Sequence, residues 1–186
     1  MKWIYNFAIY VYQMMIHCAQ FFSPKASLWI KGRKGWRNKL KESIDQENII
    51  WVHVASSGEF EQGKPVIERL STIFPKHKIL LSFFSPSGYE GKSYDKVDYV
   101  TYLPIDTIKN ARDFLRIVNP NLVVFVKYEF WFNYIDECYR RNIPLIYFSS
   151  SFRKDQVFFK SYGKCFVRQL QKCHGIYVRD EKSEQL

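Results

Sequence analysis

A carboxylate follows a strongly apolar segment of this 186-residue chain. Residues 51–55 read Trp-Val-His-Val-Ala and run into Ser56-Ser-Gly-Glu59. This pattern predicts a strand that ends where a helix begins, and open α/β sheets bind ligands at the carboxyl ends of their strands. The first turn of a helix offers N–H donors to an anionic group, so Ser56, Ser57 and Gly58 are candidate ligand contacts. Glu59 is a candidate catalytic base.

A structural interpretation fits the same residues. Ser56 and Glu59 have the Ser-x-x-Glu spacing of a capping box, and the helix dipole favours a carboxylate in the first turn. Both interpretations can hold together, because a base fixed by Ser56 and the helix start would be well oriented for proton transfer.

Strands and helices that could position this turn alternate regularly along the chain. We expect strands at residues 49–55, 78–84, 99–103, 122–127, 145–149 and 175–178. We expect helices at residues 61–73, 107–118, 130–140 and 156–171. Apolar strands separated by helices predict a Rossmann-like α/β domain, with a mostly parallel, doubly wound sheet covered on both faces.

The commonest order of such a sheet, 3-2-1-4-5-6, makes strands 1 and 4 neighbours where the winding reverses. The fourth predicted strand ends at Lys127-Tyr-Glu129. We therefore expect Lys127 and Glu129 to share one crevice with Glu59. Glu129 could orient the base or the substrate there, or it could cap a helix that starts at Phe130.

The second predicted strand ends at Ser85-Pro-Ser-Gly88. The hydroxyls of Ser85 and Ser87 and the turn amides near Gly88 are candidate contacts for a phosphate or a sugar. The same four residues are also an ordinary turn sequence.

Basic charge is concentrated at the N-terminus. The net charge is +10, and residues 1–41 carry eight basic and no acidic residues, so they account for +8. Since the remainder is nearly neutral, a nucleic-acid binder is disfavoured. The four cysteines lack metal-ligand or disulfide spacing, and neither a dinucleotide fingerprint nor a Walker loop occurs, so we expect no metal and no cofactor.

Residues 3–22 are uncharged, and their polar members Asn6, Gln13, His17 and Gln20 fall within roughly 60° of one another on a helix. Such a helix has one narrow polar stripe and a broad apolar face. It could lie in a membrane interface, cross the membrane or pack on the domain itself. No small-residue cleavage site follows Phe22, which disfavours a signal peptide.

A basic run with interleaved tryptophans follows this helix and is typical of a patch for anionic lipid headgroups or phosphates. We therefore expect residues 1–48 to form a membrane-directed arm and residues 49–186 the Rossmann-like domain. The predicted membrane contacts are Trp3, Trp29, Lys31, Arg33, Lys34, Trp36 and Arg37.

Six landmarks in this order resemble a known family. They are Lys31-Gly-Arg-Lys-Gly-Trp36, His53-Val-Ala-Ser-Ser-Gly-Glu59, Ser85-Pro-Ser-Gly88, Tyr102-Leu-Pro-Ile-Asp106, Glu129-Phe-Trp131 and Ser150-Ser-Phe-Arg153. The sequence resembles the 3-deoxy-D-manno-octulosonic acid (Kdo) transferases of Gram-negative bacteria, which transfer Kdo from CMP-Kdo to the lipid A precursor in lipopolysaccharide biosynthesis. Members of that family have two domains in the GT-B arrangement.

The resemblance implies that this chain is the N-terminal, acceptor-side domain and that the donor-binding domain is absent from it. The isolated chain is then expected to be inactive, because closure of two domains assembles the site. It further implies an inverting transfer in which Glu59 removes a proton from an acceptor hydroxyl. Lys64, Lys127 and Arg153 are candidate contacts for acceptor phosphates or carboxylates, or solvated basic side chains.

One departure from the family pattern concerns the fourth strand end. Many members have Glu-x-Glu-Leu-Trp-Pro-Asn where this chain has Lys127-Tyr-Glu129-Phe-Trp131-Phe-Asn133. A role of the first carboxylate therefore cannot be carried over to Lys127.

The resemblance places the protein at the cytoplasmic face of the inner membrane, either peripheral or anchored by its N-terminus. Its implied partners are the lipid A precursor, CMP-Kdo and an anionic membrane surface, without nucleic acid. The alternative is a non-catalytic peripheral module that binds anionic lipid through the basic arm.

Overall fold

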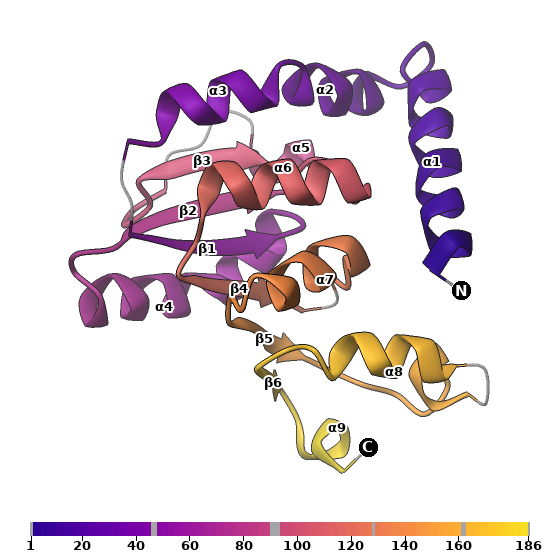
Figure 1. Ribbon diagram of the computed structural model, residues 1–186, viewed down its shortest axis with the longest axis vertical. Helices are drawn as coiled ribbons and strands as arrows, with labels where there is room; N and C mark the ends of the chain where they lie inside the picture. The colour runs from indigo at the N-terminus through magenta and orange to yellow at the C-terminus, as the bar shows by residue number, and fades with distance from the viewer. Residues whose placement is uncertain (1, 46–47, 90–93, 128, 161–162, 186) are drawn as a thin grey trace.

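The computed structural model describes residues 2–45, 48–89, 94–127, 129–160 and 163–185 (Figure 1). Six parallel strands form one sheet in the order β3-β2-β1-β4-β5-β6, which confirms the predicted fold class and strand order. The strands are β1 (Ile49–Val54), β2 (Lys78–Phe83), β3 (Tyr99–Tyr102), β4 (Leu122–Val126), β5 (Leu145–Ser150) and β6 (Gly175–Val178). β1 and β4 are therefore neighbours at the point where the winding reverses.

Successive side chains of β1 point to opposite faces of the sheet, and each face packs against its own set of helices. Trp51 belongs to an apolar cluster with α3 (Trp36–Ser43), α6 (Ile108–Val118) and α7 (Phe132–Arg140). Its neighbours Ile50 and Val52 belong to the opposite cluster, with α4 (Ser57–Ile73). All six residues of β1 are buried, as expected for the central strand of a sheet covered on both sides.

The remaining elements lie at the two ends of the chain and at the strand ends. They are α1 (Lys2–Ala19), α2 (Pro24–Arg33), α5 (Pro86–Tyr89), η1 (Val157–Phe159), α8 (Lys164–Leu170) and α9 (Glu181–Glu184). The helix predicted at 156–171 is thus observed as η1 and α8, with residues 161 and 162 outside the described ones. The helix predicted from residue 130 begins two residues later, at Phe132.

The basic arm does not stand apart from the domain. Trp36 and Leu40 of α3 lie in the same apolar cluster as Trp51, so α3 forms part of the layer that covers the sheet. Trp29, Trp36 and Arg33 are only 7%, 8% and 9% exposed. The prediction that these three side chains contact a membrane is therefore wrong, because they are packed into the interior.

Arg33 is buried because each part of its guanidinium has a partner. Its Nε donates to the carbonyl of Leu103 at 2.8 Å, and Nη2 donates to the carbonyl of Phe84 at 2.7 Å. Its Cζ lies 3.7 Å from the centre of the Trp29 ring, a cation–π contact. Burial lowers the pKa of Arg33 to about 9, which still leaves it charged at neutral pH. Arg33 thus joins α2 to the loops that follow β2 and β3.

Candidate active site at the switch point

Glu59 lies in the first turn of α4, as predicted, but the capping interaction differs from the predicted box. The carboxylate accepts a hydrogen bond from the backbone N–H of Ala55 at 2.6 Å, one residue before the N-cap Ser56. The side chain of Ser56 makes no capping bond within the described part of the chain. Glu59 is therefore held by the strand end and not by Ser56.

The surroundings of Glu59 suit a base. Burial raises the pKa of this half-buried carboxyl above its ordinary value, and the negative charge of Glu129 raises it further. The N–H of Ala55 and the charges of Lys127 and His53 act in the opposite direction. Glu59 is hydrogen-bonded to Ala55 after β1 and Glu129 contacts His53 of β1, so both carboxylates lie at the end of this strand, within electrostatic range of Lys127 at the end of β4. A carboxylate with a raised pKa is a stronger base at neutral pH.

Glu129 is fixed by its neighbours and does not cap α7. Trp131 donates its indole N–H to Oε2 of Glu129 at 2.7 Å, and Nε2 of His53 lies 3.3 Å from the same oxygen. The hydroxyl of Tyr147 donates to the backbone carbonyl of Glu129 at 2.9 Å. The N-terminus of α7 is capped instead by Asp106, which accepts from the backbone N–H groups of residues 133 and 134 at 3.0 and 3.1 Å.

His53 and Ser82 support this carboxylate from inside the sheet. They are paired in register on β1 and β2, and both are fully buried. Nδ1 of His53 lies 2.9 Å from Oγ of Ser82, which accepts a hydrogen bond from the indole N–H of Trp51 at 2.7 Å. Two buried polar groups therefore satisfy each other within an apolar layer.

Lys127 occupies a strained backbone position at the end of β4. Its φ of +66° lies in the left-handed region, which residues other than glycine seldom adopt. Its N–H donates to the carbonyl of Phe148 at 2.8 Å, and Ser150 donates its hydroxyl to the carbonyl of Lys127 at 3.0 Å. Strain of this kind persists where the surrounding structure enforces it, and it is common at functional sites.

The serine turns after β1 and β2 lie side by side. Ser57 donates its hydroxyl to the carbonyl of Ser87 at 2.5 Å, and the hydroxyls of Ser85 and Ser87 are 3.1 Å apart. The two predicted turns thus form one continuous polar rim. Gly88 has a packing role within it, because a Cβ there would lie 2.1 Å from a ring atom of Phe83. At Gly58 a Cβ would meet nothing within 4 Å, so this part of the rim is open.

Two residues predicted to contact the substrate, Lys64 and Arg153, lie away from the group formed by Glu59, Glu129 and Lys127. Lys64 is exposed on α4, and none of the polar contacts described for the site involves it. The side chain of Arg153 is 71% exposed and pairs with Asp155 at 3.3 Å. Arg153 also borders a separate hollow with Lys154 and Lys182. Their roles as acceptor contacts stay predictions.

Among the described residues, no group of three or more His, Cys, Asp or Glu side chains is placed to hold a metal ion. The polar groups that converge here are two carboxylates, a lysine and serine turns. Such a set can accept a proton, hold a hydroxyl and neutralise a nearby negative charge.

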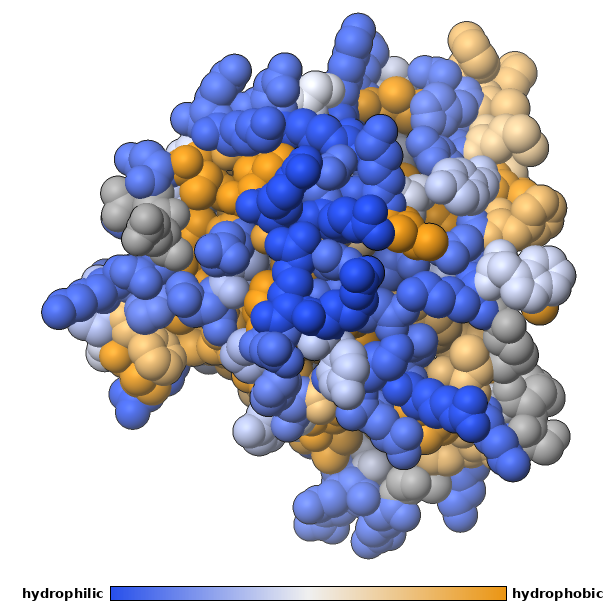
Figure 2. Space-filling model, viewed as in Figure 1, coloured by the Kyte–Doolittle hydropathy of each residue, from blue (hydrophilic) through white to orange (hydrophobic). Residues whose placement is uncertain are grey.

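The N-terminal helix α1 presents its apolar side outward. Trp3, Phe7 and Met14, which share one face, are 73%, 65% and 62% exposed. Apolar side chains lie along the edge formed by α1, while the face over α6 is hydrophilic (Figure 2). Within the described part of the chain, no helix combines the length and apolar character that spanning a membrane requires.

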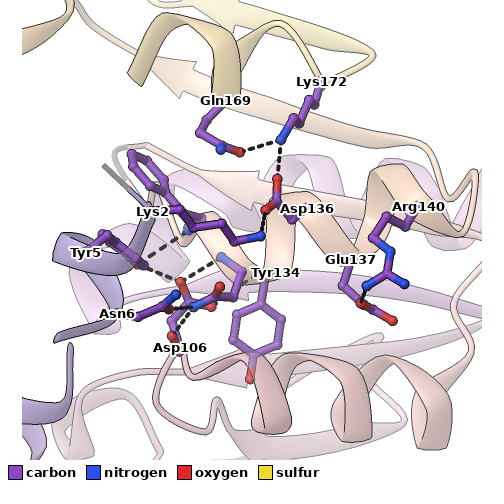
Figure 3. Close-up of polar contacts among 12 residues, drawn as sticks. Lys2, Tyr5, Asn6, Asp106, Tyr134, Asp136, Glu137, Arg140, Gln169 and Lys172 are labelled. Carbon is purple, nitrogen blue, oxygen red and sulfur yellow. Dashed lines mark hydrogen bonds and ion pairs between the residues drawn. The ribbon is translucent and has the colours of Figure 1, made fainter. Parts of the chain in front are cut away.

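Polar contacts clamp the other side of α1 to the domain (Figure 3). Tyr5 donates its hydroxyl to Oδ2 of the fully buried Asp106 at 2.5 Å, and Lys2 forms an ion pair with Asp136. Asp136 also pairs with Lys172, which follows α8. Burial raises the pKa of Asp106 to about 6, although the hydrogen bonds from Tyr5 and α7 lower it. The outward face of α1 is therefore held in a fixed orientation.

A cavity of about 540 Å³ opens between α1 and the turn that joins α2 to α3. Lys34 and Arg37 line it, together with His17 and Gln13 of α1. Arg37 also donates to Asp113 at 2.7 Å, so part of its charge is neutralised. Of the predicted membrane contacts, Trp3, Lys31, Lys34 and Arg37 remain available for that role.

The structure adds residues that the sequence analysis did not single out for the site: His53, Ser82, Trp131 and Tyr147. A sequence signal existed for two of them, since His53 and Ser82 are polar residues within otherwise apolar strands. The partnership of Trp131 with Glu129 depends on the loop conformation after β4, which no pattern predicts.

Comparison with known proteins identifies the family. Residues 30–186 match the family described as 3-deoxy-D-manno-octulosonic-acid transferase (kdotransferase). The Rickettsia prowazekii 3-deoxy-D-manno-octulosonic acid transferase is 25% identical over 194 residues, which cover 94% of this chain and 42% of the relative. The Haemophilus influenzae enzyme of the same name is 32% identical over 99 residues, covering 52% of this chain and 23% of that protein.

A bifunctional glycosyltransferase/methyltransferase of Fusobacterium nucleatum is 33% identical over 107 residues, covering 55% of this chain and 17% of the relative. Among solved structures, UDP-GlcNAc 2-epimerase from Neisseria meningitidis gives a TM-score of 0.48 at 14% identity, covering 74% of this chain and 42% of that one. The alignments span less than half the length of these relatives. With the family match extending over most of its residues, the chain belongs to the 3-deoxy-D-manno-octulosonic-acid transferase family.

Proposed function

We propose that this chain is the acceptor-side half of a GT-B glycosyltransferase that moves Kdo from CMP-Kdo to the lipid A precursor. The observation that carries the proposal is the convergence of Glu59, Glu129 and Lys127 at the switch point, in a chain of this family. The donor would be held mainly by a second domain, and no metal or cofactor is required.

Glu59 is the general base of the proposed reaction. It takes the proton of an acceptor hydroxyl as that oxygen attacks the anomeric carbon of CMP-Kdo. The bond from that carbon to the phosphate oxygen breaks, and CMP leaves with the electron pair. One base on the attacking side is what an inverting transfer needs, and general base catalysis typically contributes about 10²- to 10⁴-fold.

The rim formed by Ser57, Ser85 and Ser87 offers hydroxyls to the sugar of the acceptor. Lys127 lies close enough to Glu59 to influence its pKa, so its ammonium group can also balance negative charge on the bound substrates. The hydrogen bonds to Phe148 and from Ser150 hold the backbone of Lys127 at the strand end.

The outward apolar face of α1 supports a membrane role for the same protein. Trp3, Phe7 and Met14 would enter the interface, and Lys31, Lys34 and Arg37 would face anionic headgroups. The cytoplasmic face of the inner membrane is the proposed location, since the proposed acceptor is a lipid and the donor is a soluble nucleotide sugar.

The test is transfer itself, measured with a fusion of this chain to the C-terminal half of the Rickettsia prowazekii relative. We expect the fusion to convert CMP-Kdo and lipid A precursor to a product with inverted anomeric configuration, while the 186-residue chain alone is inactive. A product with retained configuration would contradict the mechanism. Binding to anionic vesicles without any transfer would instead favour the non-catalytic membrane module.

A further inference from the structure

His53 stands out as a polar side chain with no exposed surface in the central strand of the sheet. Its ring contacts groups on both sides. Nδ1 lies 2.9 Å from Oγ and 3.0 Å from the backbone oxygen of Ser82, and Nε2 lies 3.3 Å from Oε2 of Glu129. The ring thus connects the interior of the sheet with a carboxylate at the site.

The position of the protons follows from the partners. The indole of Trp131 has a single N–H, with Oε2 of Glu129 at 2.7 Å and Nε2 of His53 at 3.3 Å. The shorter bond to a charged acceptor takes that proton. Nε2 of His53 therefore faces an acceptor and must itself carry a hydrogen.

The opposite side of the ring is consistent with this assignment. The indole of Trp51 only donates, so Oγ of Ser82 accepts from it at 2.7 Å and keeps its own hydrogen to donate. In a neutral ring, Nδ1 accepts that hydrogen. In a charged ring, Nδ1–H donates to the backbone oxygen of Ser82. Both forms place N–H at Nε2, directed at Glu129.

We propose that His53 is a positioning residue, which together with Trp131 fixes the Glu129 carboxylate beside Glu59 and leaves Oε1 of Glu129 available to the acceptor substrate. This role rests on the proposed function. The charges of Lys127 and His53 act on Glu59, and the charge of Glu129 acts on Tyr5, Tyr12 and Tyr147.

Two substitutions distinguish the contact of Nε2 with Glu129 from the contact of Nδ1 with Ser82. In His53→Gln, the amide nitrogen can take the place of Nε2 and still donate to Glu129. In His53→Asn, the shorter amide reaches Ser82 but not Glu129. A purely structural histidine would be replaced equally well, or equally badly, by both amides.

The first measurement uses the 186-residue chain and nuclear magnetic resonance of ¹⁵N-labelled histidine. We expect His53 to carry a hydrogen on Nε2, with a resonance that shifts in Glu129→Gln. A ring protonated only at Nδ1 would overturn the proposal.

The second measurement uses the fusion enzyme, with transfer kinetics and thermal melting recorded for each variant. We expect His53→Asn to lower kcat about tenfold with little change in the KM for CMP-Kdo, and His53→Gln to stay within about threefold of the parent. In a Glu129→Gln background, His53→Asn should not lower kcat any further, because His53 acts through Glu129.

An equal loss of kcat in the parent and in the Glu129→Gln background would overturn the positioning role. A loss of kcat that parallels the fall in melting temperature would also overturn it. If His53→Asn does not fold, Trp131→Phe replaces it, because this variant removes the other donor to Glu129 and can be combined with Glu129→Gln in the same way. Undiminished transfer in Glu59→Gln would contradict the proposed function but not the position of the His53 proton, because that proton is observed without turnover.

Discussion

The centre of the sheet at the switch point and the outer face of α1 depart in opposite directions from the usual distribution of side chains. At the switch point, the polar side chains of His53 and Ser82 are buried within the sheet. On α1, large apolar groups such as Trp3 and Phe7 face outward. Buried polar groups and exposed apolar groups are the two informative exceptions in a folded protein. The buried polar groups support the proposed site at the strand ends, and the exposed apolar groups support the proposed contact of α1 with a membrane.

The largest expected effect comes from changing the exposed apolar face of α1. Replacing Trp3, Phe7 and Met14 together by Ser should weaken binding to anionic vesicles by about 100-fold, since each side chain loses its apolar burial in the interface. Cosedimentation with vesicles measures it. The melting temperature should not fall, because these side chains are exposed.

The control for that experiment is Tyr177→Ser, which removes a side chain of 61% exposure from β6. It should bind vesicles like the parent chain. Equal weakening in both variants would show that general surface apolarity, and not the α1 face, carries the membrane contact. Deletion of residues 1–41 is not a suitable test, because it would remove Trp36 and Leu40 from the core.

The second prediction concerns the clamp that orients α1. Tyr5→Phe removes a hydrogen bond to the buried Asp106 and should lower the free energy of unfolding by about 2 kcal/mol. For a chain of this size that corresponds to a melting temperature about 4–8 °C lower. Tyr10→Phe, on the exposed side of α1, is the matched control and should melt like the parent.

The third prediction has the smallest expected effect and concerns the stability of the fold as Glu59 ionises. The pKa of Glu59 is raised in the folded chain, so the folded state holds this proton more tightly than the unfolded state does. Ionisation therefore destabilises the fold as pH rises through the range above 4.5, its ordinary value. Glu59→Gln should melt slightly higher than the parent chain at about pH 8 and lose that advantage at about pH 4. A lower melting temperature at pH 8 would contradict a raised pKa.

The sequence predicted the layers of this fold well because the strands are almost wholly apolar and the helices between them are amphipathic. Strand order followed from the commonest arrangement of parallel sheets. The placement of Glu59 and Glu129 at adjacent strand ends followed in turn, since they come shortly after the neighbouring strands β1 and β4.

Burial and loop conformation determine the features that the sequence did not predict. Trp29 and Arg33 have the composition of a headgroup-binding patch, yet Arg33 finds carbonyl oxygens and aromatic rings from β2 and β3 loops that lie far away in sequence. Similarly, Asp106 belonged to a family landmark, but its role as the cap of α7 requires the folded chain.

Turnover of CMP-Kdo with lipid A precursor by the fusion enzyme tests whether Glu59 is the general base. Glu59→Gln should lower kcat by about 10²- to 10⁴-fold while CMP-Kdo binding is unchanged. Glu61→Gln, an exposed carboxylate two residues along the same helix, should transfer Kdo at the parent rate. Near-parent turnover in Glu59→Gln would show that Glu59 is not the base.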